Sequence, residues 1–114
     1  MGYVGMIKEE DIDKALSFLR DNAEKDAVAR ANRLYMQEWV KVVKAQQQAM
    51  SAASSVAASE IEAMCSSAYS IALDAYKTSI ELDEKARFLR EAASAKIEVF
   101  RTEQATRRAE GKAY

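Results

Sequence analysis

Residues 35–56 read YMQEWVKVVKAQQQAMSAASSV, and this stretch carries the clearest helical pattern of the chain. Seven of its residues are separated by steps that alternate between four and three. This spacing keeps side chains on one side of an α-helix and makes the seam of a coiled coil. The seam consists of Tyr35, Trp39, Val42, Gln46, Ala49, Ala53 and Val56.

The rest of the chain has a composition that favours the same structure. The 114 residues include no proline, and the three glycines stand at positions 2, 5 and 111. Between residues 6 and 110 no strong helix breaker occurs. Hydrophobic residues make up 49% of the chain, which argues against disorder. We therefore expect a single all-α domain.

Three helices are expected, over residues 9–20, 23–65 and 68–110. The first is short, with Ile12, Ala15, Leu16 and Leu19 on one face. The other two form a long, coiled-coil-like antiparallel hairpin. The stripe of the third helix consists of Ile71, Ala75, Thr78, Leu82, Ala86, Leu89, Ala93, Ile97 and Phe100.

The breaks between these helices rest on capping residues. Asp21 is a candidate N-cap at the first break (residues 21–22), because Glu24 follows three residues later as in a capping box. The turn of the hairpin is expected at Ser66-Ser67, because a serine hydroxyl accepts a free N–H of the first helical turn. The serines of residues 51–55 offer an alternative turn.

A two-helix hairpin of this length buries one stripe of each helix and leaves a second apolar edge. We expect a partner to cover these edges, most simply a second copy in a C2 dimer that forms a four-helix bundle. A homo-oligomer with a further protein partner is thus the expected state. The residues of the edges are Leu34, Val43 and Met50, and Leu73, Ile80 and Phe88.

Charge is unevenly distributed along the chain. Residues 27–48 carry four cations and one carboxylate, residues 58–84 one cation and six carboxylates, and residues 85–114 eight cations and four carboxylates. A turn at residues 66–67 would bring Arg33 near Arg101 and Lys44 near Arg90, which gathers positive charge at one end. Such an end can bind nucleic acid. The candidate residues are Arg30, Arg33, Arg101, Arg107 and Arg108.

The alternative interpretation of this end is structural. Tyr35, Trp39 and Phe100 lie on the predicted stripes and suit a core. Glu98 and Arg101 are three residues apart, so they can pair along one helix. Runs of charge on a helix are commonly solvated surface.

Several groups that enzymes depend on are missing. The chain has no histidine, so it lacks the usual general base and metal ligand. The single cysteine, Cys65, has no catalytic partner, and no glycine-rich loop can hold a phosphate. We expect no enzymatic activity, cofactor, metal or small-molecule substrate. The lone cysteine and the lack of a long apolar run predict a cytoplasmic protein that does not enter a membrane.

Three short motifs resemble a family of small helical proteins from tailed bacteriophages and prophages. They are Arg33-Leu34-Tyr35 with Glu38, residues 97–102 (IEVFRT) and residues 108–110 (RAE), and the similarity spans about residues 9–110. Relatives often carry tryptophan in place of Phe100 and a proline near Ser66-Ser67, so the chain departs from the pattern there. The genes of the family tend to lie near DNA replication or recombination functions. The resemblance implies a phage protein with an accessory role in that metabolism.

Overall fold

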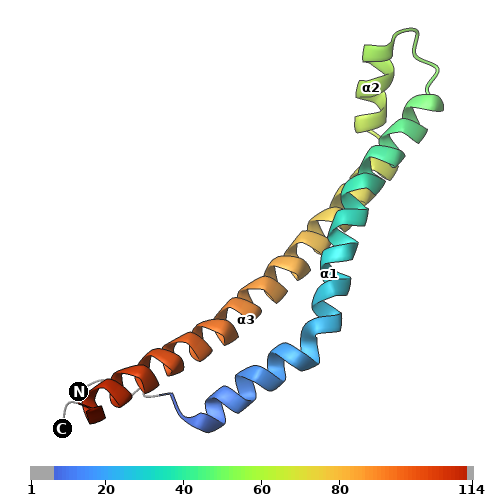
Figure 1. Ribbon diagram of the computed structural model, residues 1–114. Coiled ribbons are helices and arrows are strands. Elements are labelled where there is room, and N and C mark those ends of the chain that lie inside the picture. The colour runs from blue at the N-terminus through green and yellow to red at the C-terminus, as the bar shows by residue number, and fades with distance from the viewer. Residues whose placement is uncertain (1–6, 113–114) are drawn as a thin grey trace, which may run out of the picture. The chain divides into compact units, whose positions relative to one another are not determined.

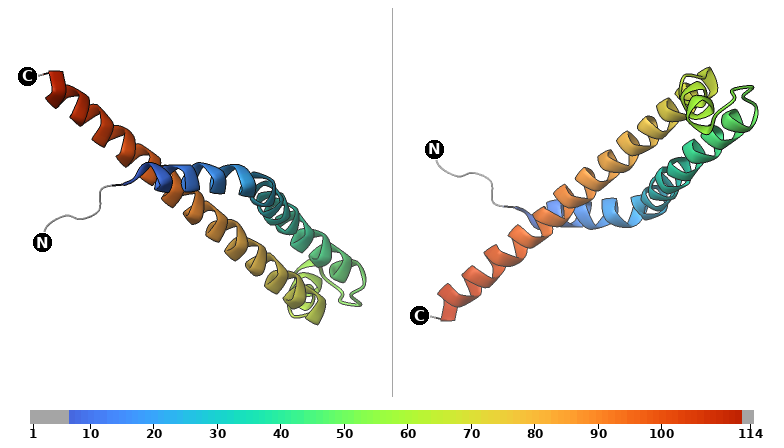
Figure 2. Two further views of the ribbon diagram at one scale, coloured as in Figure 1. Left: turned by 90° about the horizontal axis from the view of Figure 1, so that it is seen from below. Right: turned by 90° about the horizontal axis from the view of Figure 1, so that it is seen from above.

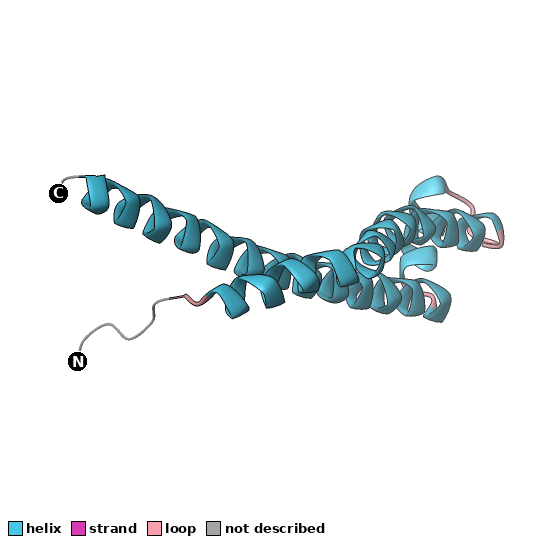
Figure 3. Cartoon of the chain, turned by 60° about the horizontal axis from the view of Figure 1, so that its bottom comes forward, coloured by secondary structure: helices cyan, strands magenta, loops and turns pink. Residues whose placement is uncertain are grey.

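The computed structural model describes residues 7–112, and all of its regular elements are α-helices (Figure 3). The elements are α1 (Glu9–Ala49), α2 (Val56–Met64) and α3 (Ser67–Lys112), as labelled in Figure 1. No strand occurs among the described residues. The predicted all-α class and the long helical hairpin are confirmed.

The chain divides into two compact units. Unit 2 contains Asp26–Lys85, and unit 1 contains the chain up to Lys25 together with the chain from Ala86 onward. In unit 2, α1 and α3 lie side by side and antiparallel, and α2 belongs to the connection between them (Figures 1 and 2).

The contact between α1 and α3 in unit 2 follows a regular spacing. The partly or fully buried residues of each helix are separated by alternating steps of three and four, as in a coiled coil. We call these two rows the inner seam. It consists of Asp26, Ala29, Arg33, Met36, Val40, Val43 and Gln47 on α1, and of Tyr69, Ala72, Tyr76, Ser79 and Asp83 on α3.

Unit 1 has an apolar contact of the predicted kind. Ile12, Ala15 and Ala93 are buried, and Ile97 and Phe100 are partly buried. These residues belong to the faces predicted for the first and third helices. Ile12, Ile97 and Phe100 therefore face inward here, as in an ordinary helix pair. Leu16 and Leu89, which belong to the same predicted faces, are exposed.

The predicted break at residues 21–22 is wrong, because α1 continues through it without interruption. The side-chain amide of Asn22 donates a hydrogen bond to the carbonyl of Phe18 at 3.0 Å, one helical turn earlier. The Asp21 carboxylate pairs with Arg20 at 3.0 Å rather than accepting a helix N–H. With neither side chain acting as a cap, nothing opposes the strong helix formers on both sides. A separate short N-terminal helix therefore does not exist.

The chain turns at both serine clusters, in residues 51–55 and at residues 66–67. The expected single helix over residues 23–65 is therefore also wrong. α1 ends at Ala49, and Ser55 caps α2 by accepting a hydrogen bond from the backbone N–H of Ala58 at 3.1 Å. At the second cluster, the Ser66 hydroxyl accepts the N–H of Tyr69 at 3.2 Å. It also donates to the carbonyl of Ala63 at 2.6 Å, which closes α2. The alternative turn thus exists beside the preferred one.

Candidate interaction surface

The seam predicted from residues 35–56 is not the row that α1 buries most against α3. Tyr35 is 65% exposed, whereas Met36 beside it lies in the inner seam. Trp39 and Val42 likewise stand one residue before the inner-seam members Val40 and Val43. One residue is 100° of helix rotation. The predicted seam therefore lies on the flank of α1, not between the helices.

The same displacement occurs on α3 within unit 2. Ile71 is 69% exposed and Leu82 is 58% exposed, and each stands one residue before a buried inner-seam residue, Ala72 and Asp83. In an antiparallel pair, positions at the same step from the seam lie on the same side of the hairpin. The displaced residues of both helices therefore form one surface, which we call the outer face. It consists of Val28, Tyr35, Trp39, Val42, Ile71 and Leu82.

The outer face carries no charge. On α1 the same rows continue through Asn32, Gln46 and Ala49, and on α3 they pass through Ala75 and Thr78. None of the side chains in these rows is a carboxylate or a cation. An uncharged surface of this kind suits burial against another apolar surface and offers nothing to an ionic ligand.

Helix α2 packs on the opposite side of the hairpin. The Lys44 ammonium donates a 2.7 Å hydrogen bond to Glu60, and the Gln48 amide donates a 3.4 Å bond to Ser59. Lys44 and Gln48 each follow an inner-seam residue, whereas the outer face precedes it. α2 therefore leaves the outer face uncovered.

The contact with α2 also changes two pKa values. The hydrogen bond from Lys44 lowers the pKa of the Glu60 carboxyl below its ordinary value, and their charge attraction adds to this. The same hydrogen bond raises the pKa of Lys44, against a smaller opposing effect of desolvation. The charged pair is thus the favoured state across the neutral range.

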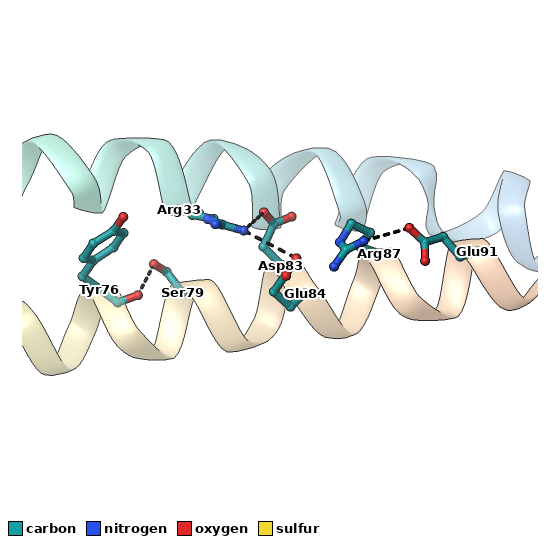
Figure 4. Close-up of polar contacts among 7 residues, drawn as sticks. All are labelled: Arg33, Tyr76, Ser79, Asp83, Glu84, Arg87 and Glu91. Atoms are coloured by element: carbon teal, nitrogen blue, oxygen red, sulfur yellow. Dashed lines mark hydrogen bonds and ion pairs between the residues drawn. The ribbon is translucent and has the colours of Figure 1, made fainter.

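The inner seam of unit 2 has a polar centre (Figure 4). The Arg33 guanidinium of α1 donates a 3.2 Å hydrogen bond to the Asp83 carboxylate of α3 and lies 3.5 Å from Glu84. Asp83 is only 8% exposed. One turn along, the buried Ser79 hydroxyl donates to the carbonyl of Tyr76 at 2.6 Å. This centre was not predicted from the sequence, because charged residues on a helix are commonly solvated surface.

The position of Arg33 corrects the predicted charge map. Arg33 contacts Asp83 and Glu84 rather than lying near Arg101, and Lys44 contacts Glu60 rather than lying near Arg90. Residues 50–66 form the connection, so the start of α3 at Ser67 pairs with the end of α1 at Ala49. A turn at residues 66–67 alone would have paired α3 with residues 50–65 first. The basic stretch of residues 27–48 therefore faces carboxylates.

The five candidate arginines are divided between the two units. Arg30 is exposed on α1 of unit 2, and Arg33 is held by the two carboxylates. Arg101 pairs with Glu98 at 3.1 Å, which confirms that predicted pair. Arg107 and Arg108 are exposed on α3 of unit 1. The five arginines thus belong to two different units, and Arg33 and Arg101 already pair with carboxylates.

The second apolar edges are only partly as predicted. Val43 is buried in the inner seam and Ile80 is partly buried, so these two need no partner. Leu34 and Leu73 are exposed, as expected. Met50 and Phe88 are exposed too, and the guanidinium carbon of Arg87 lies 4.7 Å from the centre of the Phe88 ring.

Residues 7–112 contain no metal-binding cluster and no membrane-spanning helix. No three cysteine or carboxylate side chains gather there closely enough to hold a metal ion. Cys65 caps the end of α2 and is exposed. No helix in this range has the length and apolar character needed to cross a membrane. No protein-family model, curated protein or solved structure matches the chain.

Proposed function

We propose that the protein is a non-enzymatic helical interaction protein that works by docking its outer face onto another helical surface. The observation that carries this proposal is the outer face itself, whose large apolar side chains are exposed at coiled-coil spacing. Contiguous apolar surface of this kind commonly marks a protein–protein contact. The regular spacing favours a helix as the opposing element, because helices interdigitate through rows with these steps.

The chemistry of the outer face supports binding rather than catalysis. Apart from the Tyr35 hydroxyl, its six residues contain no nucleophile, no carboxylate and no cation. A reaction at this surface would have a single hydroxyl to move a proton and no charged group to stabilise charge. The resemblance implies an accessory role in phage DNA replication or recombination, and this role stays a prediction. A protein contact through the outer face would suit such a role.

Nucleic-acid binding is the alternative function, and it stays a prediction. It would rest on Arg30, Arg33, Arg101, Arg107 and Arg108, of which Arg33 already neutralises carboxylates. Binding that weakens steeply with salt in gel shifts of single- and double-stranded DNA would support it.

Photo-crosslinking in the cells that produce the protein tests the proposed function. A photoreactive amino acid replaces Tyr35 or Leu82 on the outer face, or Gln37 or Lys77 as exposed controls on the other side of the same helices. We expect protein adducts from the outer-face positions and few from the controls. Equal yields from all four positions would contradict the proposal. The mass of the adduct shows whether the captured protein is this chain or another one.

A further inference from the structure

We propose that the chain has a second hairpin register, in which residues 50–55 become helical and the outer-face rows of α1 and α3 pack against each other. α1 and α2 then form one helix, and the turn of the hairpin moves to residues 65–66. The change of register controls whether the outer face is open to a partner or buried within the chain. This control rests on the proposed function, whereas the second register itself does not.

The break between α1 and α2 contains no residue that a helix excludes. Residues 50–55 read MSAASS, without proline or glycine, and none of them has a positive φ. Serine side chains hold the break, because Ser51 accepts the N–H of Ala53 and Ser55 accepts that of Ala58, each at 3.1 Å. The two alanines of the segment favour helix. The segment can therefore become helical when these two serine bonds are given up.

Helix α2 is held to the hairpin with little apolar burial. Among its apolar side chains only Ala63 is buried, and the three largest are more than half exposed, namely Val56, Ile61 and Met64. The hydrogen bonds of Lys44, Gln48 and Ser51 attach it to the rest of unit 2. Water can replace polar partners of this kind, so the release of α2 costs little hydrophobic free energy.

The second register brings together the two rows that the sequence predicts. One is the seam of residues 35–56, which runs on through the break, and the other is the α3 stripe from Ala75 to Ile97. Each row has seven members. When the chain turns at residues 65–66, the two rows meet one to one, because every pair is symmetric about that turn.

The paired side chains are complementary in size and carry no charge. None of the fourteen is charged, and five of the seven pairs include an alanine. Trp39 meets Ala93, and Leu82 meets Ala49. Large residues opposite small ones allow the rows of two helices to interlock. The second register thus buries Trp39 and Leu82, which the observed register leaves exposed.

Polar contacts favour the observed register. Arg33 and Asp83, which form an ion pair, are symmetric about residue 58, so the second register moves α3 by about 15 residues, or about 22 Å, along α1. That shift breaks this pair and the Lys44–Glu60 contact. It also takes Ala93 out of the apolar contact of unit 1. Conditions that weaken charge attraction and favour apolar burial therefore select the second register.

Sodium sulfate is such a condition. It screens the attraction of Arg33 for Asp83 and Glu84, and it strengthens apolar burial. A turn at residues 65–66 also brings cations of α1 and α3 together, and salt weakens their repulsion. We therefore expect the salt to raise the share of the second register.

Disulfide trapping within one chain tests the second register, in a Cys65→Ser background that removes the only native thiol. The pair Val42→Cys/Leu89→Cys is opposed in the second register. The control pair Val42→Cys/Leu82→Cys is out of place in either register and reports chance collision. In sodium sulfate we expect the 42/89 pair to close about tenfold faster than the 42/82 pair, because a disulfide needs Cα atoms within about 7 Å. Equal closure of the two pairs, with and without the salt, would overturn the second register.

The serine caps give a second route to the same state. Ser51→Ala/Ser55→Ala removes both hydrogen bonds at the break, and we expect it to speed closure of the 42/89 pair in low salt. The inner-seam pair Val40→Cys/Tyr76→Cys reports the observed register, and its closure should slow in the same variant. Amide hydrogen exchange at residues 51–55 should slow as well, because these amides enter a helix. Unchanged exchange there, in the variant and in sodium sulfate, would also count against the second register.

Photo-crosslinking keeps the two proposals apart. Face-specific adducts in cells without closure of the 42/89 pair would leave the interaction surface standing and remove the second register. Closure of the 42/89 pair without adducts would support the second register and remove the partner.

Discussion

At the scale of single residues, the position of Arg33 and Asp83 is the least expected feature. Their ion pair occupies the inner seam, where a coiled coil ordinarily places apolar side chains. A buried ion pair is weak evidence of stability, because desolvation offsets much of the attraction. A polar pair in a seam instead penalises every register in which the two groups do not meet. We interpret this pair as the group that sets the register of α1 against α3.

Substitution of Asp83 separates these effects. We expect Asp83→Ala to destabilise the protein by about 1–2 kcal/mol, because the half-buried Arg33 guanidinium keeps only Glu84. The double variant Arg33→Leu/Asp83→Leu should recover most of this loss, because leucines suit the seam. Urea unfolding at one fixed protein concentration measures both. The interpretation fails if the double variant is no more stable than Asp83→Ala.

At the scale of helices, serine side chains determine where the chain bends. The Ser51 hydroxyl accepts the N–H of Ala53 at 3.1 Å and donates to Glu62 at 2.6 Å, so it both shapes the turn and holds α2. Ser55 and Ser66 then cap α2 and α3. Serine competes for backbone groups in this way wherever helix propensity alone would continue a helix.

Two alanine substitutions distinguish a true cap from a false one. Ser55→Ala removes the acceptor for the N–H of Ala58, and we expect a loss of about 1 kcal/mol. Asp21→Ala lies within continuous α1, and we expect a change within about 0.5 kcal/mol. Thermal unfolding of the two variants beside the wild type measures the difference. Equal losses would mean that α1 does break at residues 21–22.

The Lys44–Glu60 contact predicts how the attachment of α2 depends on pH. Because the folded protein lowers the pKa of Glu60, its contribution is complete above the ordinary glutamate pKa and is lost as the pH falls through the lowered value. Because the pKa of Lys44 is raised, its contribution is complete below the ordinary lysine pKa and is lost as the pH rises through the raised value.

We expect Glu60→Gln to remove this acid-side loss. Denaturant unfolding at a series of acidic pH values would then show a smaller pH dependence in the variant than in the wild type. Glu81→Gln, an exposed carboxylate on α3, serves as the control for the change in charge. Identical pH profiles for Glu60→Gln and the wild type would show that the contact contributes nothing.

The all-α class and the long hairpin could be predicted from the sequence, but the breaks between the helices and the side of each helix that faces its neighbour could not. In α1 two rows with the same three-and-four spacing run one residue apart. One contains Tyr35 and Trp39, and the other contains Met36 and Val40. The larger side chains of the first row favoured it as the predicted seam, but the fold places the second row between α1 and α3. Spacing reports that a row contacts some helix and does not report whether that helix belongs to the same chain.

The predicted basic end was wrong because of the hairpin register. The basic end depended on a hairpin register counted from residues 66–67, and the additional turn at residues 50–55 changed that register. Capping chemistry identified both serine clusters, but helix propensity could not show that both would act at once. The outer face, by contrast, consists largely of residues that the sequence had already grouped, including Trp39 and Leu82.

At the scale of the whole molecule, the chain has a hairpin with a polar inner seam and an uncharged outer face in unit 2. The account requires that this face is covered in the working state. Association should then stabilise the folded state, because it buries apolar side chains that the hairpin alone leaves exposed. For the predicted homo-oligomer, in which a second copy covers the face, stability against heat is expected to rise with protein concentration.

Trp39 offers the most direct test, because it is the only tryptophan of the chain and lies on the outer face. The measurement is its fluorescence emission and acrylamide quenching across a dilution series of the wild-type protein. We expect a protected, blue-shifted tryptophan at high concentration that becomes red-shifted and readily quenched on dilution. An emission that stays red-shifted and fully quenchable at every concentration, with helicity retained, would contradict the account.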